Sequence, residues 1–313
     1  MAYNLKEELN KKPRFAPGHR LCAGCGAGIV VQGVLRALDE GDKAVVSNAT
    51  SCLEVSSFIY PNTAYEDSYI HSAFENGGAM TSGVETAYRA LKKRGKITDN
   101  YKFICFGGDG GTYDIGLQSL SGAMERGHDM VYVCYDNEAY MNTGIQRSSS
   151  TPRFADATTT PVGTESYGKV QNKKDLTKII AAHNVPYVAQ TTMVGNFSDF
   201  HNKAHKAIYT EGPCFLNVLS PCPRGWRYES EDLAEITKLA VDTCVWPLYE
   251  IENGEWRLTY EPKTKLPVEK FLEKQGRFKH MFLPGNEWMI EDAQAYVDKK
   301  WEELLVMCGK TGK

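Results

Sequence analysis

Gly107-Gly108-Asp109-Gly110-Gly111 sets one carboxylate among four glycines, directly after the short apolar run of residues 103–106. Glycines allow the backbone to approach a ligand closely and to turn its N–H groups toward it. A helix expected from about Asp114 to Arg126 would point the positive end of its dipole at the same place. Residues of these types in this order are suited to bind a phosphate group.

A second polar pair, Asp136-Asn137, follows the apolar run from Met130 to Tyr135. Both apolar runs are short and continuous, which predicts buried strands of a parallel sheet. Because the carboxyl ends of parallel strands share one edge, Asp109 and Asn137 should lie side by side. Their oxygens, next to a diphosphate, are the hard ligands that Mg²⁺ prefers. A glycine turn by itself is usually structural, so the asparagine about 28 residues after Asp109 makes the pattern specific.

The chain has nine cysteines, and four of them stand at positions suited to ligate a metal centre. Cys22 and Cys25 form a C-x-x-C pair among small residues, which alone is compatible with zinc, a redox dithiol or part of an iron–sulfur cluster. Cys52 and Cys222 each follow a predicted strand and should therefore face the edge that carries Asp109. The others are expected to be packing or surface thiols: Cys105, Cys134, Cys214, Cys244 and Cys308.

The remaining sequence supplies the elements that would position these residues. Apolar runs of strand length alternate with stretches of helical periodicity, which is typical of a doubly wound, mostly parallel α/β sheet. Strands are predicted at residues 44–47, 103–106, 130–135, 187–191 and 214–219, and helices at 29–38, 77–91, 114–126, 173–183, 198–209 and 231–243. Residues 1–250 should form one α/β domain and residues 251–313 a C-terminal arm, which begins in a hairpin around Asn253-Gly254 and closes with a helix from Trp288 to Leu305.

Charge and hydropathy argue against several classes of protein. The 36 basic and 39 acidic residues give a net charge of −3, which offers no reason to expect nucleic acid or an anionic membrane surface as a partner. Residues 1–15 are charged and lack the apolar core of a secretory signal, and no apolar run approaches the roughly 18 residues of a membrane span. We therefore expect a cytoplasmic protein, whose cysteines are better explained as metal ligands and buried thiols than as disulfides.

The Gly-Asp-Gly of residues 108–110, followed at residue 137 by Asn, resembles the signature of enzymes that bind thiamin diphosphate (TPP). Together with residues 138–152, EAYMNTGIQRSSSTP, it resembles the β subunit of 2-oxoacid:ferredoxin oxidoreductases, of which the pyruvate enzyme is the best known. The resemblance reaches from about Phe15 to Met281. It implies the pyrophosphate-domain TPP fold, a partner α subunit that supplies the pyrimidine domain, ferredoxin-like subunits, and a C-terminal arm that packs on a partner.

The resemblance also implies roles for individual residues around the cofactor. Asp109, Asn137 and the carbonyl of Ala139 would bind Mg²⁺. Asn142 would be a catalytic residue that donates to the substrate or to the charge developing on it. The implied cofactor-binding set is Gly108, Asp109, Gly110, Gly111, Asn137, Ala139, Asn142 and Thr143.

Cys22, Cys25, Cys52 and Cys222 resemble the ligands of the proximal [4Fe–4S] cluster in this family. Four thiolates would also hold zinc tetrahedrally. The implied reaction is oxidative decarboxylation of a 2-oxoacid, with electrons passing through the cluster to ferredoxin and with CoA as a candidate co-substrate. Two other interpretations remain open: a non-oxidative TPP decarboxylase or carboligase with structural zinc, and a non-catalytic subunit that only transfers electrons.

Pyruvate is the expected substrate, with oxalate and 2-oxoisovalerate as alternatives. Two positions depart from the pyruvate-type pattern: Thr63-Ala64-Tyr65 stands where Trp is common, and Ser68-Tyr69 where Pro-Trp is common. These departures leave the family resemblance intact and bear only on the choice of substrate. The side chains that select the 2-oxoacid could equally belong to the partner chain.

Three further segments carry polar residues whose role the sequence leaves open. The run IHSAFEN at residues 70–76 resembles the family's segment beside the cofactor, but its side chains could equally cap the following helix. The Ser/Thr-rich stretch from Ser148 to Thr164 is long and polar, which predicts a binding or inter-subunit loop. His201 and His205 have i, i+4 spacing on a predicted helix, and we expect them on a solvated face.

Overall fold

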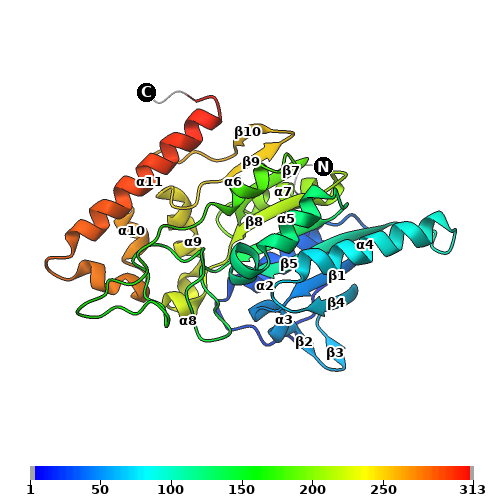
Figure 1. Ribbon diagram of the computed structural model, residues 1–313, viewed down its shortest axis with the longest axis horizontal. Coiled ribbons are helices and arrows are strands. Elements are labelled where there is room, and N and C mark those ends of the chain that lie inside the picture. The colour runs from blue at the N-terminus through cyan, green and yellow to red at the C-terminus, as the bar shows by residue number, and fades with distance from the viewer. Residues whose placement is uncertain (1–3, 311–313) are drawn as a thin grey trace.

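An eight-stranded sheet forms the centre of the computed structural model, which describes residues 4–310 (Figure 1). The strands follow the order β10-β9-β7-β8-β6-β5-β1-β4 across the sheet. From β7 to β4 every neighbouring pair is parallel, whereas β9 and β10 run antiparallel at one edge. The bounds are β1 (Lys43–Ala49), β4 (Ser68–Ser72), β5 (Tyr101–Gly108), β6 (Val131–Asp136), β7 (Tyr187–Thr192), β8 (Cys214–Leu219), β9 (Tyr249–Glu252) and β10 (Glu255–Leu258). The predicted doubly wound, mostly parallel sheet is confirmed.

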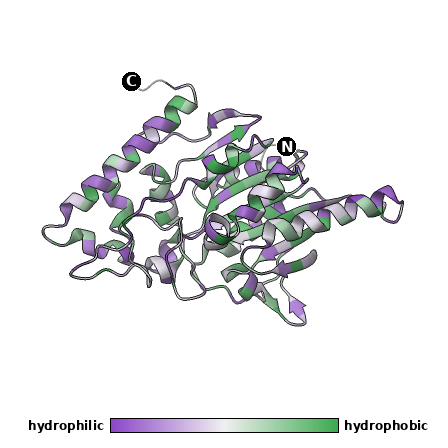
Figure 2. Ribbon diagram, in the orientation of Figure 1, coloured by the Kyte–Doolittle hydropathy of each residue, from purple (hydrophilic) through white to green (hydrophobic). Residues whose placement is uncertain are grey.

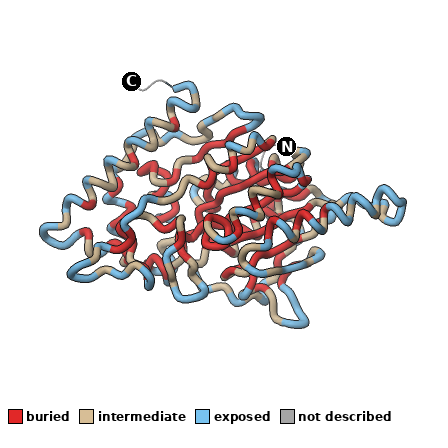
Figure 3. Tube along the Cα trace, viewed as in Figure 1, coloured by how far each residue is buried: buried red, intermediate tan, exposed pale blue. Residues whose placement is uncertain are grey.

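Helices cover both faces of the sheet, which explains why its central strands are apolar. β6, β7 and β8 are buried at every position (Figure 3). One face packs against α2 and α7, and the other against α4, α5 and α6. Figure 2 shows apolar residues concentrated in the strands and polar residues on the outer helices. These helices are α2 (Gly26–Arg36), α4 (Gly77–Lys93), α5 (Leu117–Glu125), α6 (Leu176–Ala181) and α7 (Phe197–Tyr209).

The C-terminal segments pack on the chain's own body through a third apolar cluster, to which Trp226, Phe271 and Phe278 belong. β9 crosses residue 250 and its hairpin partner ends at Leu258, so the sheet continues past the predicted start of the arm. That this arm also contacts a partner subunit stays a prediction. The remaining elements are α1 (Leu5–Asn10), α3 (Cys52–Ser57), β2 (Phe58–Ile59), β3 (Asn62–Thr63), a π-helix (Gly110–Ile115), α8 (Pro223–Trp226), two 3-10 helices (Ser230–Asp232 and Gly276–Phe282), α9 (Leu233–Asp242), α10 (Glu269–Leu272) and α11 (Glu287–Met307).

The predicted elements differ from the structure most clearly at the glycine motif. β5 continues through Gly108, and the π-helix precedes α5, so Gly110 and Gly111 begin a helix and do not form a loop. The edge strand β4 was not predicted, since its residues are mostly exposed and form no apolar run. The helix predicted at residues 173–183 is shorter, because α6 contains only Leu176–Ala181.

The two histidines of α7 do not lie on a solvated face, so that prediction is wrong. His201 is buried, and its Nε2 lies 3.6 Å from Oε1 of Glu8 in α1. His205 Nε2 lies 3.3 Å from Oδ1 of Asp39. The N-terminal segments therefore pack against this side of the helix. Among residues 4–310, no helix is both long and apolar enough to cross a membrane.

Candidate active site

The first part of the site lies where β5 and β6 end next to each other. Gly108 pairs with Tyr135 in the sheet, so the residues that follow the two strands meet at one edge. The backbone N–H of Asn137 donates to Asp109 Oδ1 at 3.3 Å. The structure thus brings together the two side chains that the sequence predicts to be neighbours.

Two oxygens converge on the side-chain amide of Asn137. That amide reaches Asp109 Oδ1 at 2.8 Å and the carbonyl oxygen of Ala139 at 3.0 Å, with its NH₂ donating to both. Glu138, which lies between Asn137 and Ala139 in the chain, has φ of 67°, a left-handed conformation that non-glycine residues adopt at a cost. With the amide turned the other way, its oxygen would join the carboxylate and the carbonyl as a third hard ligand, and such a donor set suits Mg²⁺.

Charge in the same region also fits a cation beside Asp109. Its carboxylate is fully buried, and burial raises its pKa well above the ordinary range, with a further increase from the neighbouring Asp136. Asp136 and Glu138 both pair with Lys173 Nζ, at 2.8 and 3.0 Å, and Glu138 also pairs with Arg277. In the part of the chain that the structure describes, Asp109 has no such ion pair. A divalent cation would supply the missing positive charge.

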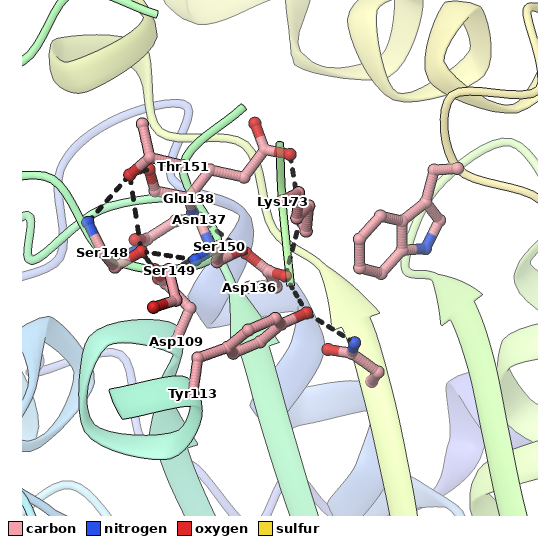
Figure 4. A network of polar contacts seen from close by, with 12 residues as sticks. Asp109, Tyr113, Asp136, Asn137, Glu138, Ser148, Ser149, Ser150, Thr151 and Lys173 are labelled. Carbon is pink, nitrogen blue, oxygen red and sulfur yellow. Dashed lines mark hydrogen bonds and ion pairs between the residues drawn. The ribbon is translucent and has the colours of Figure 1, made fainter. Parts of the chain in front are cut away.

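Hydrogen bonds from residues 148–151 hold these carboxylates in place (Figure 4). The Ser148 hydroxyl donates to Asp109 Oδ2 at 2.5 Å, and the Ser150 hydroxyl donates to Asp136 Oδ1 at 2.6 Å. The Thr151 hydroxyl donates to the carbonyl oxygen of Glu138 at 2.6 Å. All three side chains are buried. The predicted binding or inter-subunit role is therefore wrong for the start of the Ser/Thr-rich stretch, which supports the site from within.

A pocket opens in front of the converging oxygens and contains almost the whole predicted cofactor set. It is lined by Thr50, Ser51, Cys52, Phe74, Gly108, Gly110, Gly111, Tyr135, Asn137, Ala139, Tyr140, Met141, Asn142 and Thr143. Asp109 is the one residue of the predicted cofactor set that does not line this pocket. Phe74 belongs to the 70–76 segment that resembles the family's segment beside the cofactor, whereas sequence reasoning assigned no role to Thr50, Ser51 and Tyr140. Thr50 and Ser51 could have been found, because they follow β1 as Asp109 follows β5.

The glycines of the motif have a steric role in this pocket. A Cβ added to Gly110 would lie 2.4 Å from the ring of Tyr140, so only glycine fits there. Gly110 and Gly111 form the first turn of the π-helix, whose N–H groups have no helical partner upstream. The expected phosphate contact therefore keeps its physical basis, although a helix start replaces the expected loop.

The second part of the site groups the four predicted cysteine ligands. Cys25 directly precedes α2, Cys52 is the first residue of α3, and Cys222 directly precedes α8. Helix N-termini favour negative charge, which suits thiolates. Cys22 is exposed beside them.

Direct contacts bring the C-x-x-C loop next to the segment that carries the fourth cysteine. The N–H of Gly26 donates to the carbonyl oxygen of Pro221 at 3.2 Å, and the Tyr228 hydroxyl donates to that of Gly24 at 3.1 Å. Gly24 has φ of 71°, and a Cβ there would lie 2.7 Å from Cα of Ser230. Glycine inside the C-x-x-C motif therefore allows two segments about 200 residues apart to touch.

The thiols influence one another electrostatically. Burial raises the pKa of Cys25 to about 12, with smaller contributions from Cys222 and Cys22. Burial also raises the pKa of Cys52, followed by contributions from Cys222, Cys25 and the carboxylate Asp109. Thiols in this environment become thiolates when a metal centre supplies positive charge. Cys52 also lines one pocket together with Asn137 and Ala139, which places it next to the converging oxygens.

The arrangement of the cysteines leaves both metal centres considered for them open. Within residues 4–310, no three His, Cys, Asp or Glu side chains lie close enough together to hold a single metal ion. A zinc ion and a [4Fe–4S] cluster both take four thiolate ligands, so each stays a prediction for these cysteines. Three of the other cysteines are buried in strands, as expected: Cys105, Cys134 and Cys214. Cys244 is also buried but follows α9.

Known proteins resemble the chain both in part and over nearly its full length. The family "Thiamine pyrophosphate enzyme, C-terminal TPP binding domain" matches residues 49–218. Pyruvate synthase subunit PorB of Thermotoga maritima is 53% identical over 308 residues, which are 97% of this chain and 95% of that one. The same subunit of Methanocaldococcus jannaschii is 53% identical over 95% of this chain and 98% of its own length.

Two less similar proteins are named for other substrates. Ketoisovalerate oxidoreductase subunit VorB of Pyrococcus furiosus is 43% identical over 93% of this chain and 92% of its own. Among solved structures, the 2-oxoglutarate:ferredoxin oxidoreductase of Magnetococcus marinus aligns with a TM-score of 0.58 at 23% identity, covering 74% of this chain and 80% of that chain. At this identity the structural match supports the fold alone.

Proposed function

Because the chain belongs to the family of pyruvate synthase β subunits, which are 2-oxoacid:ferredoxin oxidoreductases that need partner subunits, we propose that it carries both Mg²⁺-TPP and a [4Fe–4S] cluster. Bound TPP supplies the carbon nucleophile for decarboxylation of a 2-oxoacid, and the cluster accepts the electrons. One observation carries the proposal: Cys52 lines the same pocket as Asn137 and Asn142. A cofactor in this pocket would lie close to a centre that Cys52 ligates, and such proximity would suit electron transfer.

Each part of the chain then has a defined task. Asp109, Asn137 and the carbonyl of Ala139 would hold Mg²⁺, and the first turn of the π-helix would face the diphosphate. Cys22, Cys25, Cys52 and Cys222 would hold the cluster. Asn142 is exposed at the pocket rim, where it can donate to the substrate or to charge developing on it.

Asn142→Ala should leave TPP bound and lower turnover by roughly 10²- to 10³-fold, the typical effect of losing one preorganised donor. TPP content and turnover measured on the same preparation of the complex test this. Asn202→Ala, at an exposed position on α7, is the matched control and should change neither quantity. Loss of TPP from the Asn142 variant would mean that Asn142 binds the cofactor and does not act on the substrate.

Pyruvate is the proposed substrate, since the pyruvate synthase subunits of Thermotoga maritima and Methanocaldococcus jannaschii are each 53% identical to this chain and the ketoisovalerate subunit is 43% identical. The unusual residues of the 63–69 segment give no reason to change this choice. Tyr65 stacks on Tyr69 with ring centroids 4.8 Å apart, and it packs edge-to-face against Phe15 at 5.0 Å. Neither tyrosine is among the residues that line the cofactor pocket. We keep 2-oxoisovalerate and oxalate as alternatives, CoA as co-substrate and ferredoxin as acceptor.

The isolated chain should not turn over any 2-oxoacid, because the pocket presents residues for the diphosphate side of TPP and a pyrimidine domain must come from the α subunit. The complex with its partner subunits should oxidise pyruvate with ferredoxin or a dye as acceptor. A panel of pyruvate, 2-oxoisovalerate, 2-oxoglutarate and oxalate, assayed with both preparations, tests activity and substrate together. Full activity of the isolated chain would refute the need for a partner, and inactivity of the complex on the panel would refute the proposed reaction.

A further inference from the structure

Arg277 is a buried cation that sequence reasoning did not connect with the site. It lies in the second 3-10 helix, Gly276–Phe282, and is only 2% exposed. Its guanidinium lies 4.0 Å from the ring of Trp226 and donates to Glu138 Oε2 at 2.5 Å. Gln275 accepts two more of its hydrogen bonds, at 2.9 and 2.7 Å. Its position is therefore fixed on several sides, and water does not screen its charge.

Both main partners of Arg277 hold the loop of the proposed magnesium ligands. Glu138 lies in the chain between Asn137 and Ala139. The indole N–H of Trp226 donates to the carbonyl oxygen of Asn137 at 2.8 Å. Arg277 thus supports this loop through one ion pair and one stacked ring.

Trp226 also contacts the segment that carries Cys222. Trp226 ends α8, which begins directly after Cys222, and its backbone N–H donates to the Cys222 carbonyl oxygen at 2.9 Å. Met141, from the pocket rim, also packs here: a Cβ on Gly225 would lie 2.2 Å from the Met141 sulfur and 3.7 Å from the Cys222 sulfur.

We propose that Arg277 is a positioning residue that joins the two halves of the site. Through Glu138 and Trp226 it holds the Asn137–Ala139 loop, and through its buried charge it sets the reduction potential of the centre that Cys222 ligates. This inference rests on the proposed function, because it requires a cluster at the four cysteines. Reduction adds one electron to the cluster, so a fixed positive charge nearby favours the reduced form and raises the potential.

The test is a redox titration of the intact complex, followed by EPR of the reduced cluster. Arg277→Met should shift the oxidised-to-reduced ratio at a given potential at least tenfold toward the oxidised form, which is a fall of 59 mV or more for a one-electron couple. Arg277→Lys, which keeps the charge, should retain most of the wild-type potential. Glu138 keeps its ion pair with Lys173 in both variants, so its carboxylate is not left unpaired. Arg277→Gln, which can still donate to Glu138, serves as a second neutral variant should the Met variant not fold.

Arg227→Met is the matched control. Arg227 adjoins Trp226 in the chain, but its side chain is 48% exposed and pairs with Asp156, so its loss should leave the potential unchanged. A second readout is TPP affinity, which should fall roughly 10- to 100-fold in the neutral Arg277 variants, as expected when a ligand loses an outer partner. A wild-type potential in the neutral variants, or an equal fall in the Lys variant, would overturn the role of the charge. A wild-type complex without any cluster would instead refute the proposed function.

Discussion

Asp109→Asn should release TPP and magnesium from the complex while the fold and the cysteine region stay intact. The substitution keeps the shape of the side chain but removes the buried negative charge that would face the cation. Loss of an outer partner of a metal ligand typically costs roughly 10- to 100-fold in affinity, and loss of the ligand itself should cost more. TPP and magnesium content of the purified complex, measured together with its visible spectrum, gives the result.

The folded chain should not lose stability in this variant, although TPP and magnesium are released. Burial raises the pKa of Asp109 in the folded chain, so ionisation of this carboxyl opposes folding, and the stability it contributes is lost as pH rises through the raised pKa. Without a cation, Asp109→Asn should therefore be at least as stable as the wild type at neutral pH. If Asp109 acted only as a helix cap, its replacement by Ala should lower the free energy of unfolding by about 1 kcal/mol. The Asp109 side chain, however, makes no capping hydrogen bond to the π-helix.

Two further variants sharpen the assignment. Asn137→Ala should also weaken TPP retention, but less, since a neutral amide contributes less to a cation than a carboxylate does. Asp114→Asn is the matched control, because Asp114 accepts from Ser149 N–H and lies 3.6 Å from Lys174 without facing the converging oxygens. It should retain both TPP and magnesium. Normal TPP content in Asp109→Asn would overturn the assignment of the magnesium site.

Cys222→Ser should lower the iron content of the complex and stop electron transfer to ferredoxin. A serine hydroxyl is a far poorer ligand than a thiolate for a cluster. Loss of the cluster should also destabilise the chain, because the metal links the C-x-x-C loop to a segment about 200 residues later. Iron analysis, the visible absorbance that bleaches on reduction, and thermal unfolding in the absence of air measure these effects.

Cys244→Ser is the control for the cysteine assignment. Cys244 follows α9 and is buried among apolar residues such as Trp246 and Ile236. Its replacement should leave iron and electron transfer nearly unchanged. Equal behaviour of the two variants would refute the ligand assignment, and zinc in place of iron in the wild type would support the alternative of a non-oxidative enzyme.

The sequence predicted the parts of the site that depend on strand ends. Buried parallel strands are visible as short apolar runs, and the residues after them must meet at one edge. That rule alone predicted that Asp109 and Asn137 are neighbours, and that Cys52 and Cys222 face the same edge. Which ions and cofactor these residues hold came from the family resemblance, because geometry leaves several metals open.

The residues that support the site could not be predicted in the same way. Arg277 and Glu138 are 139 residues apart, and Lys173 and Glu138 are 35 apart, with no periodic pattern that links them. Charged residues in polar segments look solvated in a sequence, and only the folded chain shows that Lys173 is part of a buried network. The π-helix was missed for a different reason: four nearby glycines predict a turn, whereas Gly110 and Gly111 begin a helix in which Tyr140 and Phe74 leave no room for a Cβ.

We propose that a metal at Asp109 and a cluster at the four cysteines share one site on this chain. EPR of the intact complex, loaded with TPP and with Mn²⁺ in place of Mg²⁺, can detect that proximity, because oxygen ligands accept either ion. A paramagnetic Mn²⁺ next to Cys52 should speed the relaxation of the reduced cluster, and Asp109→Asn should abolish that effect. A cluster signal that relaxes equally with bound Mn²⁺ and bound Mg²⁺ would show that the metal and the cysteines do not share the site.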